Sequence, residues 1–60
     1  MDTKLPEDTF MLLSFINMKL RDEYNSFDEL CASLGIDKSA VEDKLRDAGF
    51  EYSTTNNKFW

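Results

Sequence analysis

The chain has 60 residues, with 7 basic and 12 acidic side chains and no histidine, which gives a net charge of −5 at pH 7. A chain of this length forms one domain and buries only about 60% of the surface that it exposes when unfolded. The lack of histidine argues against most enzyme classes, and the single Cys31 excludes an internal disulfide. Five Phe, two Tyr and one Trp must therefore supply much of the core.

The first predicted element is a helix over residues 6–24. Pro6 suits the first helical position, because its missing N–H would have no partner there. Glu7 and Asp8 suit the positively polarised start of a helix, and the apolar pattern then continues to Tyr24.

The densest apolar window, residues 10–20, has about half the length needed to span a bilayer, so it predicts a core helix. The residues before it carry more acidic than basic side chains, unlike a secretory signal. With one free cysteine and no export signal, we expect a cytoplasmic protein.

A second helix is predicted over residues 26–34. Ser26 and Glu29 have the spacing of a capping box, in which hydroxyl and carboxylate satisfy each other's free backbone N–H groups. Gly35 supplies the left-handed residue that ends the helix. The expected inner face is Phe27, Leu30, Cys31 and Leu34.

A third helix is predicted over residues 37–48. Asp37 is its expected N-cap, and Gly49 marks its end. The expected inner face is Ala40, Val41, Leu45 and Ala48.

The last segment, about residues 50–60, is predicted to be a β-hairpin. Two β-favouring triplets flank a polar stretch in which Asn56 and Asn57 tolerate the positive φ of a tight turn. A free hairpin of this size is barely stable in water, so it must lie on the helices. The predicted fold is therefore mainly α: residues 1–60 form a single domain, a three-helix, helix-turn-helix-like bundle with a short C-terminal hairpin, like a miniature winged helix.

The second and third predicted helices have helix-turn-helix spacing, which would place residues 37–48 in a DNA major groove. The charge of this helix argues against it, since four acids (Asp37, Glu42, Asp43 and Asp47) face three bases (Lys38, Lys44 and Arg46). Specific DNA-binding proteins commonly neutralise about 6–10 phosphates, and the hairpin offers only Lys58. We expect no unaided binding to nucleic acid.

The first predicted helix carries two apolar stripes. At about 100° per residue, one stripe contains Phe10, Leu13, Ile16, Leu20 and Tyr24. The second contains Met11, Phe15 and Met18. A surface helix needs only one apolar face, so the second stripe is covered either by Tyr52, Phe59 and Trp60 or by a protein partner or a second copy.

Asn17 and Arg21 lie between the stripes, one turn apart. They present a polar contact to a partner, since guanidinium groups bind carboxylates in a bidentate way. The alternative is structural, with Arg21 paired to a nearby acid and Asn17 bound to backbone groups.

No residues with the pattern of a catalytic, cofactor or metal site stand out. Adjacent carboxylates, at 22–23, 28–29 and 42–43, sit at helix ends or on polar faces, and no acid-rich loop with a turn glycine suggests a cation site. Cys31 lies on a predicted inner face and has no histidine to activate it. We therefore expect no enzyme activity, no cofactor, no metal, no small-molecule substrate and no membrane association.

Longer runs of the sequence resemble a family of short bacterial proteins classified as a domain of unknown function. The resemblance spans nearly the whole chain. It is carried by Leu5-Pro6, Asp8, Phe10-Met11-Leu12-Leu13-Ser14, Asn17, Lys19-Leu20-Arg21-Asp22-Glu23-Tyr24, Asp28-Glu29-Leu30-Cys31, Gly49-Phe50-Glu51-Tyr52 and Phe59-Trp60. It implies a bacterial stand-alone domain and transfers no catalytic or binding residue.

The sequence does not reveal a biological role, but it favours one class of protein over others. The first hypothesis is a non-enzymatic protein-interaction or self-association module that uses Met11, Phe15 and Met18, with Asn17 and Arg21 beside them. The alternative is a helix-turn-helix DNA-binding domain that acts as a dimer or within a larger complex.

Overall fold

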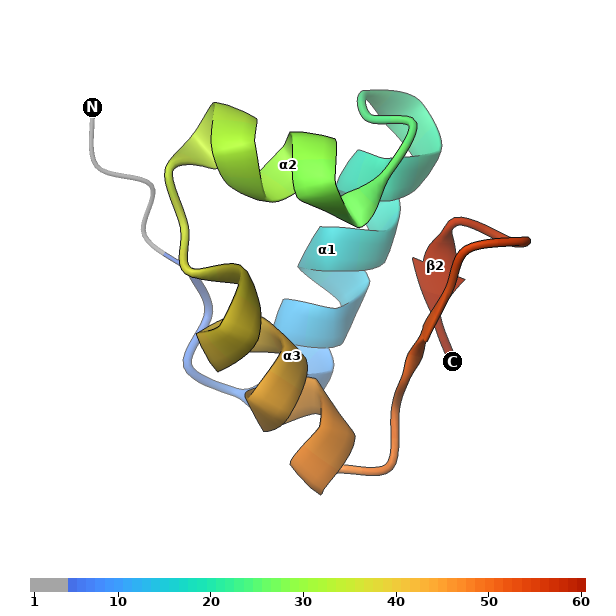
Figure 1. Cartoon of the computed structure of the whole chain (residues 1–60). Helices are drawn as coiled ribbons and strands as arrows, with labels where there is room; N and C mark the ends of the chain where they lie inside the picture. Colours follow the sequence, from blue (N-terminus) through green and yellow to red (C-terminus); the bar gives the residue numbers. More distant parts are fainter. Residues whose placement is uncertain (1–4) are drawn as a thin grey trace.

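The computed structural model describes residues 5–60 and contains three helices followed by an antiparallel hairpin (Figure 1). This confirms the predicted fold class. The elements are α1 (Thr9–Asp22), α2 (Phe27–Leu34), α3 (Lys38–Asp47), β1 (Tyr52–Ser53) and β2 (Lys58–Phe59). The three helices contact one another, and the hairpin lies alongside α1 (Figure 1).

The start of α1 differs from the prediction. The Asp8 carboxylate accepts a hydrogen bond from the Met11 backbone N–H at 3.0 Å, so Asp8 is the N-cap and the helix begins at Thr9, not at Pro6. An acidic side chain in this position satisfies a free N–H and also meets the positive end of the helix. Pro6 and Glu7 therefore precede the helix.

The end of α1 also comes earlier than predicted, at Asp22 instead of Tyr24. The backbone N–H groups of Glu23 and Tyr24 both donate to the Lys19 carbonyl, at 2.8 and 3.1 Å, which unwinds the last turn. Tyr24 therefore follows the helix, and its ring is half-buried against the core.

The predicted N-caps Ser26 and Asp37 are confirmed, with the hydroxyl half of the predicted capping box in place; α3 ends at Asp47, one residue before the predicted 48. Ser26 Oγ accepts from the Glu29 N–H at 3.1 Å, and the Asp37 carboxylate accepts from the Ser39 N–H at 3.0 Å. Both cap residues are extended, so the helices begin one residue after the predicted bounds of 26 and 37. Gly35, with φ of +67°, ends α2 in the left-handed conformation that a side chain would disfavour.

The core lies where the three helices meet the hairpin. Its buried members are Leu12, Ile16 and Leu20 of α1, Phe27, Leu30 and Cys31 of α2, Val41 and Leu45 of α3, and Phe59 of β2. Two parts of the predicted inner faces are wrong: Phe10 of the first stripe is exposed, and so are Ala40 of α3 and its C-cap Ala48. The buried residues of α1, which we call its buried seam, are Leu12, Ile16 and Leu20. The seam includes Leu12 because α2 and α3 pack on that side of the helix.

Phe59 attaches the hairpin to the helices. Its side chain is 2% exposed, and its ring meets Phe27 edge-on with the centroids 4.9 Å apart. The Tyr52 ring packs on it at 5.4 Å. The prediction that the hairpin lies on the helices is confirmed, and aromatic packing is the reason.

The hairpin pairs Tyr52 with Phe59 and Ser53 with Lys58. Glu51 and Trp60 exchange two further backbone hydrogen bonds, at 3.2 and 3.1 Å. Residues 54–57 form the turn, and in it only Asn57, with φ of +51°, takes the positive φ that was expected of both asparagines. A four-residue turn does not require the two consecutive left-handed residues of the tightest hairpins.

Candidate functional site

The candidate site is an apolar row on α1 that lies outside its buried residues Leu12, Ile16 and Leu20. Met11, Phe15 and Met18 lie on it at i, i+4 and i+7, and we call these three residues the outward face. Met11 is 63% exposed and Met18 is 44% exposed, whereas Phe15 is half-buried against the edge of the core. At 1.5 Å per residue the two methionines are about 10.5 Å apart along the helix, or two turns.

The hairpin aromatics do not cover the two methionines, so that predicted alternative is wrong for Met11 and Met18. Tyr52 and Phe59 pack on Phe27, on the inner side of the hairpin. Trp60 is itself 62% exposed, and the Lys58 ammonium lies 4.9 Å from the centre of its ring. The side chains alternate along a strand, so Trp60 points away from the face that carries Phe59.

Ion pairs flank the outward face at its C-terminal end. Lys19 Nζ lies 2.6 Å from Glu23 Oε2 and 5.7 Å from the centre of the Phe15 ring. Arg21 binds both carboxylate oxygens of Asp22, at 3.0 and 3.2 Å. The hydrogen bond to Glu23 raises the pKa of Lys19, and the hydrogen bond from Arg21 lowers the pKa of Asp22.

The two polar residues predicted beside the stripes have different surroundings. The Asn17 amide binds the backbone of Phe59 twice: Nδ2 donates to the carbonyl at 2.9 Å, and Oδ1 accepts from the N–H at 2.8 Å. Asn17 thus joins the hairpin to α1, as the structural alternative expected. Arg21 is exposed and paired with Asp22, and it lies next to the outward face.

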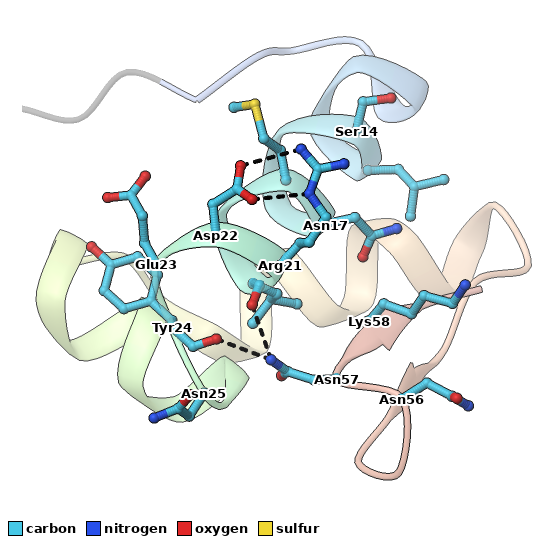
Figure 2. A pocket seen from close by; sticks show the side chains of 13 residues that line it. Ser14, Asn17, Arg21, Asp22, Glu23, Tyr24, Asn25, Asn56, Asn57 and Lys58 are labelled. Atoms are coloured by element: carbon cyan, nitrogen blue, oxygen red, sulfur yellow. Dashed lines mark hydrogen bonds and ion pairs between the residues drawn. The ribbon is translucent and has the colours of Figure 1, made fainter.

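A groove of about 780 Å³ lies between α1 and the hairpin turn, with Ser14 and Arg21 on one side and Lys58 on the other (Figure 2). Met18 also lines this groove. Asn57 lies at its end, and its Nδ2 donates to the carbonyls of Leu20 and Tyr24 at 3.1 and 3.0 Å (Figure 2). The amide groups around the groove hold the fold together, and Met18 lies where the groove meets the outward face.

Three interactions were not predicted from the sequence. The first is the contact of Asn57 with the carbonyls of Leu20, in α1, and Tyr24, just after it. The second is the hydrogen bond from the Tyr52 hydroxyl to Asn57 Oδ1, at 2.7 Å, while that hydroxyl accepts from the Phe27 N–H at 3.3 Å. The third is the edge-on pair of Phe10 and Phe50, with ring centres 6.0 Å apart. The tolerance of asparagine for positive φ indicated the turn but not its partner in α1.

Cys31 is buried in the core, and its burial raises the pKa of the thiol. A raised pKa keeps the sulfur protonated and weakly nucleophilic at neutral pH. Among residues 5–60, no three side chains of His, Cys, Asp or Glu come together in a way that could hold a metal ion. In the same part of the chain, no helix has the length and apolar character needed to cross a lipid bilayer.

The geometry defines a class of protein: a small, mainly helical domain, closed by a docked hairpin, whose candidate site is an exposed helix face. The chain belongs to the family described as a domain of unknown function, DUF4250, whose model matches residues 6–59. This confirms the predicted resemblance to a domain of unknown function, while the expected bacterial origin stays a prediction. No curated protein and no solved structure matches the chain.

Proposed function

We propose that this protein is a non-enzymatic interaction module that binds a helix of another protein along the outward face of α1. One observation carries the proposal: Met11 and Met18 are 63% and 44% exposed on the side of α1 opposite its buried seam. A 60-residue domain has little apolar area to spare, so exposing two methionines on a helix that already has a buried face needs an explanation.

The spacing of the outward face favours a helical partner. Anchor residues at i, i+4 and i+7 form one straight row along a helix, and a second helix lying against it meets such a row at matching intervals. Methionine has a flexible, polarisable side chain that adapts to the surface of a partner, which is why methionines are frequent in binding surfaces of this type. The half-buried Phe15 lies between them in this row.

Charge favours a different protein over a second copy or a nucleic acid. Two copies would each bring a net charge of −5 to the contact. The four acids at positions 37, 42, 43 and 47 lie on α3 or at its cap, the element that a helix-turn-helix protein would place in DNA. A second copy of the chain and a nucleic acid would therefore both be repelled at low salt.

The test is a titration of the ¹⁵N-labelled protein with three synthetic helical peptides, followed by amide chemical shifts. The peptides share one apolar face and have cationic, acidic or uncharged polar faces. We expect at least one peptide to shift the amides of residues 11–18 and to lose that effect in Met18→Glu, while Ala40→Glu, which adds the same charge at an exposed site on α3, binds normally.

The proposal fails if none of the three peptides perturbs the outward face. It also fails if Met18→Glu and Ala40→Glu bind equally well, because the contact would then not involve Met18. Circular dichroism of both variants checks that the helices persist. Sedimentation of the free protein is expected to show a monomer, and DNA added at low salt is expected to cause no shift.

A further inference from the structure

We infer that the partner helix is cationic, with Lys or Arg on both sides of its apolar face. This inference rests on the proposed function, since it concerns the chemistry of the partner that occupies the outward face. Two features support a cationic partner: the distribution of charge around that face, and the intramolecular partners of every basic side chain among residues 5–60.

Acidic groups frame the outward face at both ends. The N-cap Asp8 lies three residues before Met11 and accepts from its backbone N–H, and Glu7 comes just before the helix; both are exposed. Asp22 lies one turn after Met18, in line with it on the helix, and Glu23 follows. Four acids thus surround the three apolar residues, against the two bases Lys19 and Arg21 on the same segment.

The two bases are already engaged. Lys19 is held by Glu23 at 2.6 Å, and Arg21 is held by Asp22 in a bidentate pair. These pairs leave Glu7 and Asp8 as carboxylates with no ion pair to a basic side chain among residues 5–60. The backbone N–H of Met11 is the one hydrogen-bond donor that the structure assigns to Asp8 in that range. The Lys44 ammonium also lies at this end, 2.6 Å from the Glu7 carbonyl oxygen, so Glu7, Asp8 and Lys44 together carry a charge of −1 toward a partner.

The other basic side chains among residues 5–60 also have partners within the chain. Lys38 is paired with Asp28 at 2.6 Å and Arg46 with Asp43 at 3.3 Å. The Lys44 ammonium donates to the backbone carbonyl of Glu7 at 2.6 Å, and Lys58 lies over the Trp60 ring. The net charge of −5 is therefore carried by carboxylates facing solvent. Such a field attracts a cationic segment and speeds its encounter.

The experiment uses the peptides of the preceding test as fluorescent probes, with dissociation constants measured by anisotropy at low and high salt. We expect the cationic peptide to bind about ten-fold more tightly than the acidic one at low salt, the size expected of a few exposed charge pairs. At about 1 M salt the Debye length falls to roughly 3 Å, so the difference should largely disappear while the apolar contact remains.

A matched pair of variants separates the effect of the acids next to the outward face from the effect of the overall charge. Glu7→Gln with Asp8→Asn removes two charges next to the face, and asparagine preserves the N-cap. Glu29→Gln with Glu51→Gln removes two exposed charges on α2 and before β1. We expect the first variant to weaken binding of the cationic peptide several-fold and the second to change it little.

Three results would overturn the inference. One is equal or tighter binding of the acidic or uncharged peptide, which would leave the proposed function intact and refute only the cationic partner. Another is an equal effect of the two double variants, which would mean that the overall charge attracts the peptide and that the acids next to the outward face have no special effect. The third is equal binding of a cationic peptide with the same composition but scattered apolar residues. Failure of all the amphipathic peptides would refute the proposed function itself.

Discussion

Replacing Asn17 by alanine should destabilise the domain more than any other single change on the surface of α1. The side chain is part-buried, and its amide forms two hydrogen bonds with the backbone of Phe59, a residue 42 positions away. Asn17 therefore completes the hydrogen bonding of a strand edge that has no second strand beside it. Asn17→Ala leaves the Phe59 N–H and carbonyl without their partners.

The magnitude follows from these two bonds. A typical hydrogen bond adds about 0.5–1.5 kcal/mol, and a buried group left unpaired costs about 1–3 kcal/mol. Because water reaches part of this site, we expect a total loss of about 2–3 kcal/mol from the free energy of unfolding. A 60-residue domain has only about 3–9 kcal/mol in all. The loss corresponds to a fall in Tm of roughly 10–20 °C.

Urea unfolding followed by circular dichroism measures this loss, and hydrogen exchange of the Phe59 amide reports on the contact directly. Ser14→Ala is the control, because Ser14 lies on the same helix and is exposed. Asn17→Asp keeps the acceptor for the Phe59 N–H but turns a carboxylate oxygen toward its carbonyl, so it should be unstable at neutral pH. A change of less than about 0.5 kcal/mol for Asn17→Ala, the size of an ordinary surface substitution, would show that Asn17 does not hold the hairpin on α1.

Three further predictions test other parts of the fold. Asn57→Gly keeps the positive φ but removes the bonds to the carbonyls at the end of α1, so urea unfolding should show a loss of about 1–2 kcal/mol; no loss would mean that water replaces the amide. Gly35→Ala should cost about 1 kcal/mol through its left-handed backbone alone, since no atom lies within 4 Å of the added Cβ, and Gly35→Asn should cost less; equal values would contradict this. Cys31 should react slowly with a disulfide reagent at neutral pH and rapidly in denaturant, because burial raises its pKa and shields the sulfur; fast labelling of the native protein would show that this part of the core opens.

The sequence determined the local features of the fold. Ser26 and Asp37 as caps and Gly35 as a helix stop could be predicted, because each acts through backbone groups within a few residues of itself. The start of α1 was misplaced, because Pro6 tolerates the first helical position but only the hydrogen bond of Asp8 decides where the helix begins.

The candidate site was partly predictable for the same reason. Periodicity separated Met11, Phe15 and Met18 from the other apolar residues of α1, since spacing along a helix is a local property. It did not show that the buried seam passes through Leu12, or that Phe10 lies outside it, because a helix alone does not specify which arc its neighbours cover.

Only the tertiary structure decided what holds the hairpin on α1. Asn17 and Asn57 reach backbone groups 42 and 33–37 residues away, and no pattern along the chain connects such distant positions. The packing of Phe59 on Phe27 is likewise a contact between residues that lie far apart in the sequence. By placing the hairpin beside α1 instead of over Met11 and Met18, these long-range contacts leave the two methionines exposed.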